Sequence, residues 1–292
     1  MSESVIPVDL LNPGQVFACI GLTEAADVLV GGASGGFDWS DPSGPRFRLT
    51  ANGASSPVVV VLEFLASAEV CAQVPARSSD GSLTTEKWSV PTETLRDGCP
   101  FPFTLPPSPA TLPATLRRGG IEISIDHWGD STDRDNVKFW AGAGGYPGVA
   151  LLRDALDLVR DRLPTATKDP FALHAAQSSS FRLDWRRDYV PLGIGFSLNR
   201  HSRITPRGYP LVEILGAIGL SHARPARPNP RDKLVYRYGV VAGDRIPLPL
   251  LRAALGGSVL PFPSRQFRVQ LSWPGKEGQA RCITDVIEET HA

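Results

Sequence analysis

The stretch NPGQVFACIGLTEAADVLVGG, residues 12–32, predicts a long helix near the start of the chain. Asn12 can cap the first turn, Pro13 suits the first helical position, and the glycine pair Gly31-Gly32 ends the helix. The apolar residues between them recur at the spacing of a helix. The fold class then depends on what accompanies this helix.

Three further stretches predict helices. Residues 146–164, YPGVALLRDALDLVRDRLP, place their apolar side chains on one stripe and alternate Arg with Asp on the other face. Residues 210–220, PLVEILGAIGL, are apolar almost all round, which indicates a helix that is buried or held by a partner. In residues 55–75 four valines favour a strand. However, Ser56 followed by Pro57 marks a helix start and the run is too long for one strand, so we predict a helix.

Other segments indicate strands, because they alternate apolar and polar residues or are rich in β-branched and aromatic residues. They are residues 46–50, 120–128, 179–185, 233–242, 265–273 and 280–289. The Pro-rich residues 98–120 are predicted to be mostly loop. Helices and strands mix without a strict βαβ rhythm. We therefore predict an α+β fold of mixed, mainly antiparallel sheets, about four to five helices and loops rich in Pro and Gly.

The formal net charge of zero conceals two halves of opposite charge. Residues 1–150 carry 9 Lys/Arg and 17 Asp/Glu, whereas residues 151–292 carry 21 and 13. We predict an acidic N-terminal α+β part, residues 1–165, and a basic, Arg-rich α+β part, residues 166–292, with one continuous domain as the alternative. Such asymmetry suits a face for a polyanion, or two faces for different partners. Arg outnumbers Lys by 25 to 5, which favours bidentate contacts with phosphate or guanine, although a GC-rich genome produces the same bias.

The cysteines and the N-terminus bear on the compartment. The four cysteines lie far apart and form no C-x-x-C pair, which excludes a local zinc knuckle and argues against a disulfide scaffold. The first residues, MSESVIPVDLLNPG, have no basic region and no long apolar run, so we expect no signal peptide. No stretch approaches the ~18 apolar residues of a membrane span. A cytoplasmic protein without a membrane partner is therefore expected.

A glycine-rich loop, WAGAGGYPG, precedes the helix predicted at 146–164. It lacks the G-K-[ST] ending of a nucleotide-binding loop and the acidic residue of a dinucleotide fingerprint. Free backbone N–H groups at a helix start can nevertheless hold a phosphate, and a cation and aromatic rings stand beside them. Its candidate nucleic-acid contacts are Lys138, Trp140, Gly142, Gly144 and Gly145; a purely structural loop is the alternative.

Residues 182–252 form the strongest electrostatic feature, with 13 Lys/Arg against 5 Asp/Glu. Aromatic residues interleave with the arginines, a mixture that suits base stacking and phosphate contacts. The alternative is a solvated basic surface that pairs with the acidic half. The candidate nucleic-acid-binding residues here are Arg182, Arg186, Arg187, Asn199, Arg200, Arg203, Arg207, Arg224 and Arg227.

Catalytic patterns are scarce. The chain contains no G-x-S-x-G and no H-E-x-x-H, and its five histidines are scattered. Residues 126–135, DHWGDSTDRD, could hold a divalent metal through Asp126, His127 and Asp130, but their spacing matches no calcium loop. We expect a solvated acidic loop there, and no catalytic residue, metal or cofactor.

Three segments together resemble one family. They are VDLLNPGQVFACIGLTEAADVLVGGASGGFDWS (8–40), DHWGDSTDRDNVKFWAGAGGYPG (126–148) and GFSLNRHSRITPRGYPLVEILGAIGLSHARP (195–225). They are similar to the small variant of the CRISPR-associated large-subunit (Cas-eight-like) proteins of type I-U, also called I-G, systems. The resemblance spans most of the chain in the same order, but its motifs are not catalytic signatures.

This resemblance implies a non-catalytic subunit of a Cascade surveillance complex. Its implied partners are the guide RNA with the backbone and 5′-end subunits, double-stranded target DNA, and transiently the helicase-nuclease. The subunit would read the protospacer-adjacent motif and help to open the duplex, while guide pairing supplies most of the specificity. Two alternatives remain: an assembly subunit that contacts only protein and guide RNA, and a metal-dependent nuclease.

Overall fold

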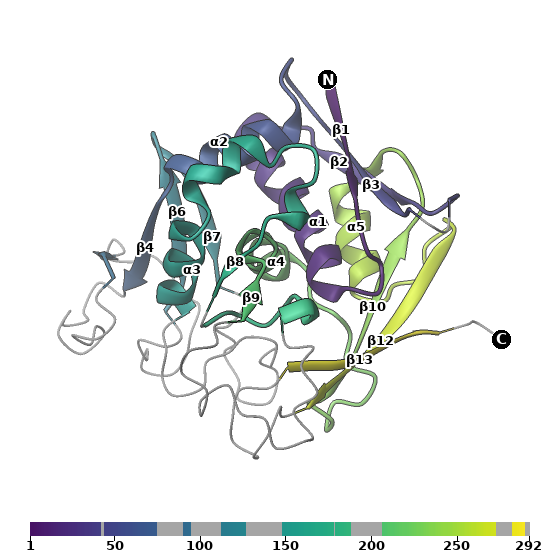
Figure 1. Ribbon diagram of the computed structural model, residues 1–292. Coiled ribbons are helices and arrows are strands. Elements are labelled where there is room, and N and C mark those ends of the chain that lie inside the picture. Colours follow the sequence, from purple (N-terminus) through teal and green to yellow (C-terminus); the bar gives the residue numbers. More distant parts are fainter. Residues whose placement is uncertain are drawn as a thin grey trace.

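The computed structural model describes residues 1–41, 44–74, 90–94, 112–126, 148–177, 179–187, 206–272 and 282–289 (Figure 1). Within these ranges, five α-helices accompany sheets whose pairings are antiparallel except between β4 and β5. The predicted α+β class is confirmed. One hydrophobic cluster runs from Ile6 to Ile283. Residues on both sides of position 165 therefore contribute to the same core.

Helix α1 (Pro13–Val30) forms where the local signals predict it. The Asn12 Oδ1 atom accepts a hydrogen bond from the Gly14 N–H at 3.1 Å, and the helix ends at Gly31, whose φ of 74° is costly for other residues. Its side chains are buried without a break from Pro13 to Ala26. Such burial on every side requires neighbours all round the helix.

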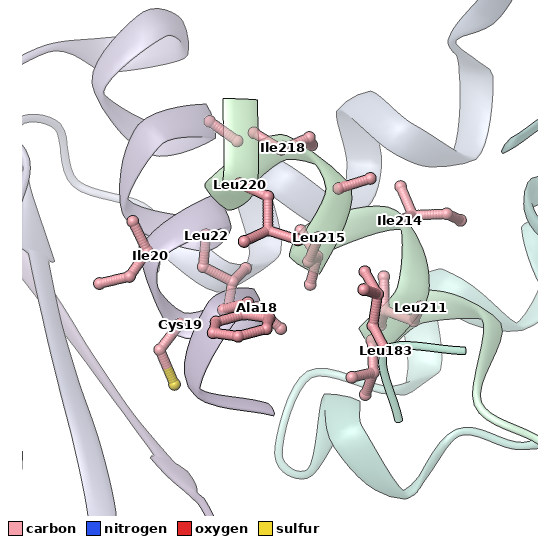
Figure 2. Packing of buried hydrophobic residues seen from close by; sticks show 14 of the residues in the cluster. Ala18, Cys19, Ile20, Leu22, Leu183, Leu211, Ile214, Leu215, Ile218 and Leu220 are labelled. Atoms are coloured by element: carbon pink, nitrogen blue, oxygen red, sulfur yellow. The ribbon is translucent and has the colours of Figure 1, made fainter. Parts of the chain in front are cut away.

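Helix α4 (Pro210–His222) is the most extensive of these neighbours. Figure 2 shows its leucines and isoleucines packed against α1. The two backbones touch: a Cβ atom at Gly21 would lie 1.8 Å from the Leu215 carbonyl oxygen, and one at Gly219 would lie 2.3 Å from the Phe17 carbonyl oxygen. Residues 210–220 are all buried within the chain, so α4 is a core helix.

Two sheets cover one side of this helix pair (Figure 1). In the first the order is β1-β3-β2-β11, and in the second it is β10-β12-β13. The Phe17 ring of α1 meets Tyr238 edge-on at 5.9 Å, and Tyr238 stacks on Phe267 at 5.1 Å. The strands are β1 (Ser2–Pro7), β2 (Ser34–Asp38), β3 (Arg46–Ala51), β10 (Val235–Val241), β11 (Ile246–Pro247), β12 (Ser264–Ser272) and β13 (Cys282–Glu289). The strands predicted at 46–50, 233–242, 265–273 and 280–289 are confirmed.

A third sheet, β5-β4-β6-β7, lies on the other side of α1 and α4 (Figure 1). Its strands are β4 (Glu69–Val74), β5 (Thr92–Thr94), β6 (Ala114–Arg118) and β7 (Ile121–Ile125). The single helix predicted over 55–75 is wrong in its second half, because α2 (Pro57–Ser67) ends where Ala68 becomes extended and β4 begins. Strand β6 lies inside the predicted loop 98–120, whereas β7 confirms the strand predicted at 120–128.

Two other expectations need correction. The helix predicted over 146–164 is α3 (Gly148–Asp157) followed by the 3₁₀ helix η5 (Arg160–Thr165), which contains Pro164, a residue that cannot continue an α-helix. The strand predicted at 179–185 is absent from the described residues there. The N–H groups of Leu183 and Asp184 donate instead to the buried Glu213 carboxylate, each at 3.1 Å, and the 3₁₀ helix η7 (Trp185–Arg187) follows. The remaining short elements are η6 (Pro170–Ala172), β8 (Ala175–Ala176), β9 (Arg207–Gly208) and α5 (Leu248–Leu255).

Helix α1 is the one described helix long and apolar enough to cross a bilayer. This differs from the expectation that no stretch approaches such a length. Of its 18-residue window, 78% is buried inside the molecule, and the helix carries the polar residues Gln15, Thr23 and Glu24. The same composition is typical of a helix at the centre of a core.

One ion pair fastens α5 to α1. Arg252 donates from Nε and Nη2 to the two Glu24 oxygens, each at 2.6 Å, and Glu24 is 4% exposed. Arg252→Met should lower the free energy of unfolding by about 2–3 kcal/mol, because it leaves a buried carboxylate without its cation. This value lies below that of a fully buried pair because Arg252 is 37% exposed.

Urea unfolding followed by circular dichroism measures this effect, with the double variant Glu24→Gln/Arg252→Met as the control. The double variant should recover most of the loss, because no buried charge then remains. A single variant as stable as the unmodified protein would contradict the prediction.

Candidate nucleic-acid interface

The structure describes six of the fourteen predicted contact residues. Arg182, Arg186 and Arg187 lie at and just before η7, Arg207 lies in β9, and Arg224 and Arg227 follow α4. The other predicted contacts fall outside the described residues; they are Lys138, Trp140, Gly142, Gly144, Gly145, Asn199, Arg200 and Arg203.

A buried polar network holds Arg186. Asp184 is fully buried and accepts hydrogen bonds from the Asn12 side chain at 3.0 Å and from the Arg186 backbone N–H at 3.0 Å. The Arg186 Nε atom donates to the same carboxylate at 2.9 Å, and its Nη2 atom donates to the Phe171 carbonyl oxygen at 2.9 Å. The cap of α1, the 3₁₀ helix η7 and η6 thus meet at one charged pair.

The Arg186 guanidinium also stacks on an aromatic ring. Its Cζ atom lies 3.3 Å from the centroid of Tyr209, the residue that precedes α4. Pairing on one edge and stacking on one face fix the orientation of the group. Its Nη1 atom has no hydrogen-bond partner among the described residues.

A second arginine is fixed in the same way. Arg265 on β12 donates from Nε to Glu288 on the neighbouring strand β13 at 2.6 Å, and from Nη2 to the other oxygen of that carboxylate. This hydrogen bonding raises the pKa of Arg265 and lowers the pKa of Glu288. The Arg265 Cζ atom lies 5.8 Å from the Trp39 ring centroid, and Nη1 has no partner within the described part of the chain.

Both arginines line one cleft. Its volume is about 500 Å³, and its walls come from residues 7–11, from Gly44 and Pro45, and from Asp169, Phe171 and Ala172 at the η6 segment. Gln15 of α1 and the carboxylates of Asp9 and Asp169 complete the polar lining. Helix η7, which carries Arg186, packs against β13, and Glu288 of β13 pairs with Arg265 of β12. Residues far apart in the sequence therefore supply the two guanidinium groups. We name this feature the Arg186–Arg265 cleft.

The sequence prediction identified Arg186 but missed Arg265 and Gln15. A signal for Arg265 was present, because it alternates with Phe267 and Val269 on one face of its strand, and both are fully buried. A charged residue on such a face needs a partner or a ligand. Gln15 gives no comparable signal, because a single glutamine in an apolar helix has no distinctive spacing.

The other described arginines lie elsewhere. Arg224 and Arg227 flank Ala226, whose N–H and carbonyl groups each bond to Arg237 of β10 at 2.8 Å. This segment therefore runs along the edge of β10. Arg207 is exposed in β9, and the Arg182 backbone adopts a φ of 60° with its N–H donating to Ser180 Oγ.

The predicted alternative of a metal site has one described member. The Asp126 backbone N–H donates to Ser221 Oγ at 3.1 Å, whereas His127 and Asp130 fall outside the described residues. Nowhere in the described ranges do three His, Cys, Asp or Glu side chains gather as ligands for a metal ion.

No protein-family model matches this chain, and comparisons with curated proteins and with solved structures give no match either.

Proposed function

We propose that the protein is a non-catalytic, large-subunit-like component of a type I CRISPR RNA-guided surveillance complex. In this role it contacts target DNA at the protospacer-adjacent motif, helps to open the duplex and helps to recruit the helicase-nuclease. The family resemblance of residues 8–40, 126–148 and 195–225 supports the assignment to such a complex. The nucleic-acid part rests on one observation, the presence of two orientation-fixed arginines, Arg186 and Arg265, in one cleft.

The arginines of this chain suit the contacts that such a role requires. Guide pairing supplies most of the specificity, so the protein needs contacts with only a few base pairs and with the backbone of the duplex. Fixed arginines suit the reading of base edges, because an oriented guanidinium loses little conformational entropy on binding. Exposed arginines such as Arg207 suit contacts with phosphates, whose affinity falls as salt rises.

Co-expression of the tagged chain with its neighbouring genes and a guide array tests the assignment. RNA of guide length should co-purify with the chain in a large complex. A chain that elutes alone and free of RNA would overturn the CRISPR role.

Replacing Arg207, Arg224 and Arg227 by alanine should weaken target-DNA binding by the assembled complex. The dependence of log K on log salt should fall by about 0.9 for each phosphate contact removed. Electrophoretic binding assays between about 50 and 200 mM salt measure this slope. The matched control replaces Arg118, Arg153 and Arg162, which lie on β6, α3 and η5 in the acidic part. Equal effects of the two triple variants would contradict a localised interface.

An assembly subunit that contacts only protein and guide RNA is the second candidate. It is favoured by Val259, which is 96% exposed in the turn after α5, beside the partly buried Leu260 and Phe262. Helix α4 cannot serve as the docking element, because its residues 210–220 are covered by the chain itself. If the Arg207, Arg224 and Arg227 triple variant fails to assemble, this second candidate is favoured. An assembled complex that has lost DNA binding favours the first.

A further inference from the structure

We draw no further inference here: the strongest candidate, the apolar surface patch in the turn after α5, where Val259 is 96% exposed beside the partly buried Leu260 and Phe262, carries none because nothing in the structure shows what covers it.

Discussion

Replacing Gly21 by alanine is expected to destabilise the protein by about 3 kcal/mol, the upper part of the range for overpacking a core. In an exposed helix the same change would stabilise by about 1 kcal/mol, since glycine is a poor helix former. The sign reverses here because the new Cβ would lie 1.8 Å from the Leu215 carbonyl oxygen. Neither atom belongs to a flexible side chain, so α1 and α4 would have to move apart and lose packing. Gly219→Ala should act in the same way.

Urea unfolding followed by tryptophan fluorescence measures the change through the denaturation midpoint. Gly256→Ala is the control, because that glycine has a φ of −72° and its nearest atom to an added Cβ is 3.5 Å away. This control should change the midpoint little. A Gly21→Ala protein with an unchanged midpoint would show that the two helices do not meet backbone to backbone.

Removing the side chain of Arg186 is expected to cost about 3 kcal/mol of stability, in addition to any effect on binding. Asp184 would lose its cation while remaining fully buried, with only Asn12 and the local backbone N–H left as partners. The estimate lies at the lower end for broken buried pairs, because Arg186 is 28% exposed. Its lost stacking on Tyr209 adds to the effect.

Thermal and urea unfolding of Arg186→Ala would measure this cost, with Arg207→Ala as the matched control. Arg207 is exposed, so its replacement should change stability by less than about 0.5 kcal/mol. The double variant Asp184→Asn/Arg186→Met should recover part of the loss because it removes the uncompensated charge. An Arg186→Ala variant with the same free energy of unfolding as the unmodified protein would contradict the prediction. Binding experiments on the cleft should therefore use Arg265, whose partner Glu288 is 37% exposed.

The elements that follow their local signals are those whose ends and periodicity are written in neighbouring residues. Helix α1 has its cap at Asn12, its proline at Pro13 and its glycine end at Gly31, and each acts within a few residues. The strands β10, β12 and β13 alternate strongly enough to be recognised alone. Helix α2 begins at the predicted pair, with Ser56 at the N-cap position and Pro57 at the first helical position. The Ser56 side chain makes no capping hydrogen bond, and Ser4, on β1, accepts from the Val58 N–H at 3.3 Å instead.

The elements that were missed depend on distant partners. Residues 69–74 continue an apolar run that suits a helix, yet they form β4 because β6 supplies antiparallel hydrogen bonds along one edge. Residues 179–185 suit a strand. However, the backbone N–H groups of Leu183 and Asp184 donate hydrogen bonds to the Glu213 carboxylate, which lies about one helical turn into α4. In both places the tertiary contact outweighs a local preference of at most ~1 kcal/mol.

By itself, the amino-acid sequence determined the α+β class, the caps of α1, the apolar character of α4 and the concentration of arginine in the second half, because these are local or compositional properties. Only the tertiary structure decided which arginines act together. Arg186 and Arg265 lie far apart in the chain, and each is oriented by a carboxylate: Asp184, two residues before Arg186, and Glu288, on the strand next to Arg265. Asp184 in turn contacts Asn12, 172 residues earlier. A shared cleft depends on distances in space, and residue spacing along a chain does not encode them until the backbone has folded.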